Sequence, residues 1–148
     1  MSTIKFSLPF RAISVNDSYY GNRKFGMKKE AKEWTYAVNW ELAKHSSQFD
    51  ILREQFNPKE HGLSVSFCFI YKEFFNKSGS VSSKIYDLTN CEKLLLDLIV
   101  DSAHHGIAPY KSPNLNINDK HVIELFSKKA PGAQDRIDIE IKIVNIKN

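Results

Sequence analysis

Residues 63–71 read Leu-Ser-Val-Ser-Phe-Cys-Phe-Ile-Tyr, and this stretch decides the fold. Large apolar side chains alternate with smaller ones, which is the pattern of a strand with one buried face. The buried face is expected to carry Leu63, Val65, Phe67, Phe69 and Tyr71, opposite Ser64, Ser66 and Cys68. The stretch therefore predicts a sheet strand whose apolar side needs a second layer of structure to cover it.

Three other segments show the same alternation. Residues 4–8 form a short strand that ends at Pro9. Residues 122–126 form a strand after a loop, and residues 137–143 carry isoleucine at every second position. These segments predict further strands of the same sheet.

Two longer segments change to the period of a helix. Residues 27–45 place one apolar stripe along a helix, made by Ala31, Trp34, Val38 and Leu42. Residues 89–103 predict a second helix with Gly106 as its stop signal. Its core side is expected to hold Cys91, Leu94, Leu95, Leu98 and Ile99. Residues 49–56 add a further helical turn or two.

The predicted element order is β-α-β-α-β-β, which is typical of a two-layer α+β fold. We expect one mixed sheet with two main helices on one face. The 148 residues suit a single domain over 1–148, and we find no internal repeat or domain boundary. The hydrophobic content of 42% is that of a folded protein and excludes a disordered chain.

Charge and cysteine content narrow the class of protein further. The formal net charge of +4 and the pI of about 9.0 are compatible with a nucleic-acid partner. Cys68 and Cys91 each lie in an apolar run and are expected to be reduced, as in the cytoplasm. The chain has no apolar run of about 18 residues and no signal peptide, so we expect no membrane partner.

Polar residues that can carry chemistry gather at the start of the second predicted helix. Asn90, Lys93 and Asp97 fall on one helix face, and Asp87 precedes that face. Two structural explanations remain open. Asp87 or Thr89 can be a helix N-cap, and Lys93 with Asp97 can be a surface pair at i,i+4.

Asp119 favours a functional interpretation. It precedes the strand 122–126, whose start can lie beside the start of the second helix in a two-layer fold. Asp87 and Asp119 would then be hard oxygen ligands, which suit Mg²⁺. Mn²⁺ would be able to substitute for it. Such an ion activates water and stabilises charge on a phosphodiester, and Lys93 beside it would bind the phosphate.

The chain resembles the RusA family of Holliday junction resolvases, which phages and prophages often encode. The family has a D-x-D-N-x-x-K pattern at a helix start, a later Asp, and an Asp-Asp pair before the next strand. The matching positions here are Asp87, Asn90, Lys93, Asp97 and Asp119. The family's opening pattern is matched by Leu8-Pro9, Ser14-Val15-Asn16, Tyr19-Tyr20 and Arg23-Lys24.

The resemblance implies a homodimeric, Mg²⁺-dependent endonuclease that resolves four-way DNA junctions by paired symmetric nicks in recombination and repair. Asp87, Lys93 and Asp119 would be catalytic, and Asn90 and Asp97 would support them. The chain departs from the pattern where Thr89 and Asn118 replace aspartates, and where residues 107–117 resemble an insertion. Thr89 would be a weaker metal ligand than a carboxylate, and Asn118 would support Asp119.

DNA contacts are expected from polar, aromatic and basic residues outside this motif. These residues are Asn16, Tyr20, Arg23, Lys24, Lys28, Lys128 and Lys129. The N-terminal group can equally be a loop packed on a neighbouring strand. Two other functions remain open: a relative that binds branched DNA without cleaving it, and a plain interaction module in which residues 87–97 are only a capped helix.

Overall fold

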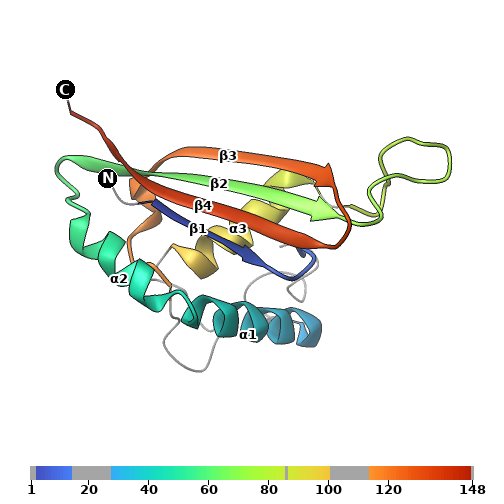
Figure 1. Cartoon of the computed structure of the whole chain (residues 1–148), viewed down its shortest axis with the longest axis horizontal. Helices are drawn as coiled ribbons and strands as arrows, with labels where there is room; N and C mark the ends of the chain where they lie inside the picture. Colours follow the sequence, from blue (N-terminus) through green and yellow to red (C-terminus); the bar gives the residue numbers. More distant parts are fainter. Residues whose placement is uncertain (1–2, 15–27, 86, 101–113, 148) are drawn as a thin grey trace.

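Four strands form one mixed sheet, and helices cover one of its faces in the computed structural model (Figure 1). The structure describes residues 3–14, 28–85, 87–100 and 114–147. The strands are β1 (Thr3–Leu8), β2 (His61–Tyr71), β3 (Val122–Pro131) and β4 (Arg136–Asn145), in the spatial order β1-β4-β2-β3. β2 and β3 run parallel, while β4 is antiparallel to both β1 and β2.

Three α-helices and one short 3-10 helix complete the described part of the chain. They are α1 (Lys29–Ala43), α2 (Ser46–Gln55), α3 (Leu88–Ile99) and η2 (Asp119–His121). The order β-α-α-β-α-β-β confirms the α+β class and the mixed sheet. The further helical turns expected at residues 49–56 form a separate helix, α2, which begins after a turn at Lys44.

The period of two in the sequence appears directly as alternating burial. In β4, Ile137, Ile139 and Ile141 are buried, while Asp138 and Glu140 between them reach the other face. Phe67 of β2 pairs with Ile139, so the two strands present their apolar side chains to the same layer. The expected buried faces of the strands at residues 4–8, 63–71 and 137–143 are therefore confirmed.

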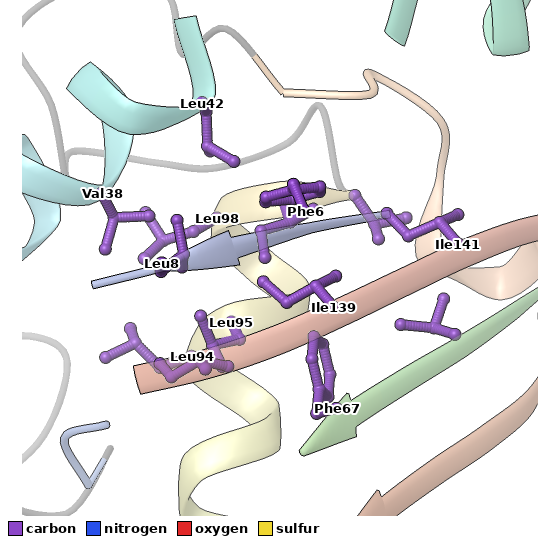
Figure 2. Close-up of a cluster of buried hydrophobic side chains, with 14 of the residues drawn as sticks. Phe6, Leu8, Val38, Leu42, Phe67, Leu94, Leu95, Leu98, Ile139 and Ile141 are labelled. Atoms are coloured by element: carbon purple, nitrogen blue, oxygen red, sulfur yellow. The ribbon is translucent and has the colours of Figure 1, made fainter. Parts of the chain in front are cut away.

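The core lies between this face of the sheet and the helices (Figure 2). All the side chains predicted for the core side of α3 are buried: Cys91, Leu94, Leu95, Leu98 and Ile99. Val38 and Leu42 of α1 close the other side of the cluster. Burial of whole Leu and Ile side chains contributes about 1.5–3 kcal/mol each, so this cluster fixes how the helices sit on the sheet.

The opposite face of the sheet carries mostly polar side chains, and two ion pairs join some of its charges. Lys5 Nζ lies 3.2 Å from Glu140 Oε2, and Arg136 Nε donates to Asp138 Oδ1 at 3.0 Å. Ser7 Oγ donates to the same carboxylate at 2.6 Å. Cys68 is half-buried on this face, whereas Cys91 is in the core. No helix in the described ranges is long and apolar enough to cross a bilayer.

Leu98→Ala should lower the free energy of unfolding by about 2–5 kcal/mol, because it removes a fully buried side chain from the centre of the core. Urea denaturation measures this loss. Ile51→Ala on α2, where the side chain is 52% exposed, is the matched control and should change it by less than about 0.5 kcal/mol. Equal losses in the two variants would contradict the assignment of the core.

Asp138 should contribute to acid sensitivity. Burial alone raises the pKa of Asp138, but hydrogen bonds from Ser7 and Arg136 and the charge of Arg136 outweigh burial and lower that pKa. The carboxylate therefore stabilises the fold above its unfolded pKa, and this stability is lost as the pH falls through the folded pKa. Asp138→Asn should flatten the acid limb of stability against pH in urea titrations between about pH 2 and 6, and Ser7→Ala should flatten it partly. Parallel acid limbs in wild type and Asp138→Asn would exclude this role.

Candidate active site

The start of α3 presents a carboxylate that is not used for capping. Asp87 occupies the N-cap position with extended backbone, and its main-chain carbonyl accepts hydrogen bonds from the amides of Asn90 at 3.2 Å and Cys91 at 3.3 Å. Its side chain makes no capping hydrogen bond and is exposed. The exposed carboxylate therefore stands beside free amide groups of a helix start, where negative charge is favoured.

The buried face of α3 determines what its other face presents. Because Cys91, Leu94 and Leu98 face the core, Lys93 lies on the opposite side of the helix and is exposed. Thr89 is also exposed, while Asn90 and Asp97 are half-buried. The predicted polar face of the helix is therefore confirmed as a solvent-facing group.

Asp87 is the N-cap residue of α3, as one structural explanation expected, but the described residues show neither a capping bond from its side chain nor the surface pair of the other explanation. No ion pair there joins Lys93 to Asp97, and neither Asp87 nor Lys93 has a side-chain hydrogen bond. Asp97 does have an interaction of its own. The side chains of Asp87 and Lys93 are thus available for a ligand.

The start of α3 lies beneath the ends of β2 and β3. Burial raises the pKa of the Cys91 thiol to about 11, while the adjacent Tyr71 hydroxyl and the charge of Lys129 oppose this rise. Tyr71 ends β2, and Lys129 lies near the end of β3. These neighbours place the first turn of α3 at the edge where the two parallel strands finish.

Asp119 lies at the other end of α3. The amide of Leu115 donates to the carbonyl of Ile99 at 2.8 Å, and the amide of Ile117 donates to that of Val100 at 3.0 Å. Residues 114–117 therefore run beside the last turn of the helix. Asp119 follows two residues later, exposed, at the first position of η2.

Asn118 has a structural role next to this carboxylate. Its side-chain carbonyl accepts a hydrogen bond from the amide of Lys120 at 2.9 Å and so caps η2. This cap orients the turn that exposes Asp119 just before β3 begins. Asn118 is therefore a backbone cap, and its support of Asp119 in a metal site stays a prediction.

Asp87 and Asp119 are not brought together within one chain. They flank the 12 residues of α3, a length of about 18 Å. β3 begins opposite Leu63 and finishes opposite Tyr71, so the two carboxylates lie at opposite ends of the strand as well. The expectation that the strand start lies beside the helix start is wrong for a single chain, because residues 114–117 return to the end of α3 and not to its beginning.

A single chain consequently does not fit a Mg²⁺ ion shared by the two carboxylates. No group of three or more His, Cys, Asp or Glu side chains gathers as a metal site in the parts of the chain that the structure describes. The start of α3 supplies Asp87 with the neutral side chains of Thr89 and Asn90, and η2 supplies Asp119. Mg²⁺ prefers one or two carboxylates completed by water and phosphate oxygens, so one chain offers half of the predicted site at each end.

The predicted DNA contacts fall into three groups. Asn16, Tyr20, Arg23 and Lys24 lie outside the described residues, and Lys28 directly precedes α1. Lys128 and Lys129 are in β3, which continues beyond the predicted residues 122–126 to Pro131 alongside β2. Neighbouring residues in a strand point to opposite faces, so Lys128 lies on the open face of the sheet and Lys129 on the α3 side.

Sequence reasoning missed two arginines, which contact the segments that lead to Asp87 and to Asp119. Arg11 donates to the carbonyl of Lys84 ahead of α3, and Arg53 donates to the carbonyls of Asn114 and Leu115 ahead of η2. Neither contact leaves a signal in a single sequence, because the partners are more than 60 positions apart.

Comparison with known protein families finds no family that matches this chain, and no curated protein matches it either. The likeness to the RusA family rests on the residues named above.

Cys91 should resist alkylation while the protein is folded. Its thiol is buried and its raised pKa keeps it neutral at pH 8, so iodoacetamide should modify the half-buried Cys68 first. Mass spectrometry of digested protein measures the order, and unfolding in urea should equalise the two rates. Early labelling of Cys91 in a Cys68→Ser variant without denaturant would contradict the packing of α3.

Proposed function

We propose that this chain is a metal-dependent, RusA-like endonuclease that resolves four-way DNA junctions. The observation that carries the proposal is the start of α3, where Asp87 and Lys93 are exposed and unengaged by other described side chains. A carboxylate that holds a cation and a nearby lysine that holds a phosphate are the groups that phosphodiester cleavage requires. The cytoplasm, which holds the DNA, would be its location.

The edge strand β3 supports a symmetric dimer. Within the described residues β3 pairs with β2 alone, so its other edge carries unpaired backbone groups. Ile123, Leu125 and Phe126 on this strand are 50%, 39% and 57% exposed. An apolar edge strand of this kind is suited to pair with another strand, and two copies of one chain pair most simply about a two-fold axis.

Antiparallel pairing of two β3 strands would complete the site. It would bring the start of β3 in one copy to the end of β3 in the other, which is the end near Cys91 and the start of α3. Asp87 would then face Asp119 of the partner subunit, and each dimer would hold two such pairs. Mg²⁺ or Mn²⁺ held there would activate water and stabilise the charge on the phosphodiester.

The remaining residues would position DNA around this pair. Lys93 would bind the scissile phosphate, and Thr89 would contact the metal or its water as a weak ligand. Asn90 and Asp97, both half-buried on α3, would orient the turn and Lys93. Lys129, on the α3 side of β3, would contact the DNA backbone next to the site. Binding through such contacts should weaken steeply with salt.

A binding-only relative is the alternative, and one observation favours it. A single chain separates its two carboxylates by the length of α3, and Thr89 removes a third carboxylate from the start of the helix. Without the dimer, the protein would then bind branched DNA and leave it intact.

Wild type should nick a labelled four-way junction at symmetric positions in Mg²⁺ or Mn²⁺ and leave linear duplex intact. Asp87→Asn and Asp119→Asn should each slow cleavage by about two orders of magnitude, because each removes one charge from the site. Gel analysis of the labelled strands measures the rates. Glu54→Gln, which neutralises an exposed carboxylate on α2, is the matched control and should cleave as wild type does.

Mixing the two inactive variants tests whether the site is shared. In a mixed dimer one site would carry both substitutions and the other would be intact, so nicking should return to roughly a quarter of the wild-type level. No recovery on mixing would place both carboxylates of a site in one chain. Tight junction binding by wild type without nicks in either metal would establish the binding-only alternative.

A further inference from the structure

Arg11 connects the approach to α3 with the rest of the fold. Its Nη2 donates to the carbonyl of Lys84, three residues before Asp87, and its guanidinium carbon lies 5.5 Å from the centre of the Tyr71 ring. Its own carbonyl accepts a hydrogen bond from Trp34 Nε1 at 2.9 Å. One residue therefore joins the exit of β1, helix α1, the end of β2 and the segment that leads to Asp87.

Arg53 does the same for the approach to η2. From α2, its Nε donates to the carbonyl of Leu115 at 2.9 Å and its Nη2 donates to the carbonyl of Asn114 at 3.2 Å. A third hydrogen bond, from Nη1 to Asp50 Oδ1 at 2.8 Å, fixes the orientation of the guanidinium. Arg53 therefore fixes the segment four residues ahead of Asp119.

Backbone hydrogen bonds tie Leu115 and Ile117 to the last turn of α3, and the two arginines add side-chain hydrogen bonds to each segment from other elements. Residues 82–85 form a turn, and residues 114–118 are irregular, with Asn116 in the left-handed region at φ 61°. The carboxylates that follow are exposed and are not oriented by partners of their own among the described side chains. Their positions consequently depend on the main chain before them.

Both arginines are well placed for this task. Ala12, next to Arg11, is 2% exposed, and Leu52, next to Arg53, is fully buried, so each guanidinium extends from an anchored backbone. A guanidinium offers several N–H donors in a rigid plane and can hold two carbonyls at once. Lysine has a single flexible ammonium group and cannot reproduce that geometry.

We propose that Arg11 and Arg53 are positioning residues that set the locations of Asp87 and Asp119 by clamping the main-chain carbonyls ahead of them. The inference rests on the proposed function, since it assigns the two arginines to the two halves of that site. Each acts through the backbone and contacts neither DNA nor metal.

The test compares Arg11→Lys and Arg53→Lys with Arg136→Lys, which removes an arginine contact on the open face of the sheet. Junction cleavage is followed over a range of Mg²⁺ concentrations, and junction affinity is measured separately in Ca²⁺. The two clamp variants should lose about 10–100-fold in cleavage rate or Mg²⁺ affinity, as is usual when the support of a metal ligand is removed. The junction affinity of the two clamp variants in Ca²⁺ should match that of wild type. Arg136→Lys should match wild type in cleavage rate, Mg²⁺ dependence and junction affinity.

Hydrogen exchange provides a readout that does not depend on activity. Arg53→Lys should speed exchange of the Leu115 and Ile117 amides, and Arg11→Lys that of the Asn90 and Cys91 amides, with the core strands unchanged. If wild type nicks the junction and the two clamp variants cleave as fast as Arg136→Lys does, the inference is overturned and the proposed function is left intact. If wild type fails to nick the junction, the proposed function fails. The exchange rates of these four amides then decide by themselves whether the arginines hold the two segments. Faster exchange throughout the molecule would show a general structural role and overturn the inference.

Discussion

The burial of one face of α3 against the sheet is the constraint on which the rest of the structure depends. Cys91, Leu94 and Leu98 occupy the core, and this fixes the rotation of the helix about its axis. Lys93 must then face solvent, because it lies opposite that stripe. In Figure 1 the helix crosses beneath the sheet, with its start near the ends of β2 and β3 and its last turn beside residues 114–117. The separation of Asp87 from Asp119 is therefore a property of the core.

An uncovered edge follows from the same arrangement. The helices cover the middle of the sheet and leave Leu125 of β3 39% exposed on the side that faces them, while Phe126 is 57% exposed on the other. Lys128 and Lys129 on the same strand place charge along this edge, which discourages indiscriminate strand pairing. An antiparallel copy of β3, with its own lysines displaced along the strand, would cover the exposed apolar side chains and keep the like charges apart. Dimer formation and completion of the site would then be one event.

Periodicity made most of the fold predictable, and tertiary contacts account for what it missed. Alternation of apolar residues located the buried strand faces, and the helical stripe located the core side of α3. The helical turns expected at residues 49–56 begin three residues earlier, at Ser46. The strand expected at residues 122–126 continues to Pro131, because its extension exists through pairing with β2. The motif located the polar face of α3. The distance from Asp87 to Asp119 was not predictable, since it depends on how residues 114–117 return to the helix.

In the proposed site, shared by two subunits, the two departures from the RusA pattern would have a physical meaning. Asn118 caps η2 through a side-chain carbonyl, a bond that an aspartate carboxylate could also accept, so the turn is kept while one negative charge is removed. Thr89 removes another at the start of α3. Carboxylates that approach across an interface repel one another until a cation arrives. A site with fewer of them would attract Mg²⁺ less strongly, but its two halves would assemble more readily before the metal binds.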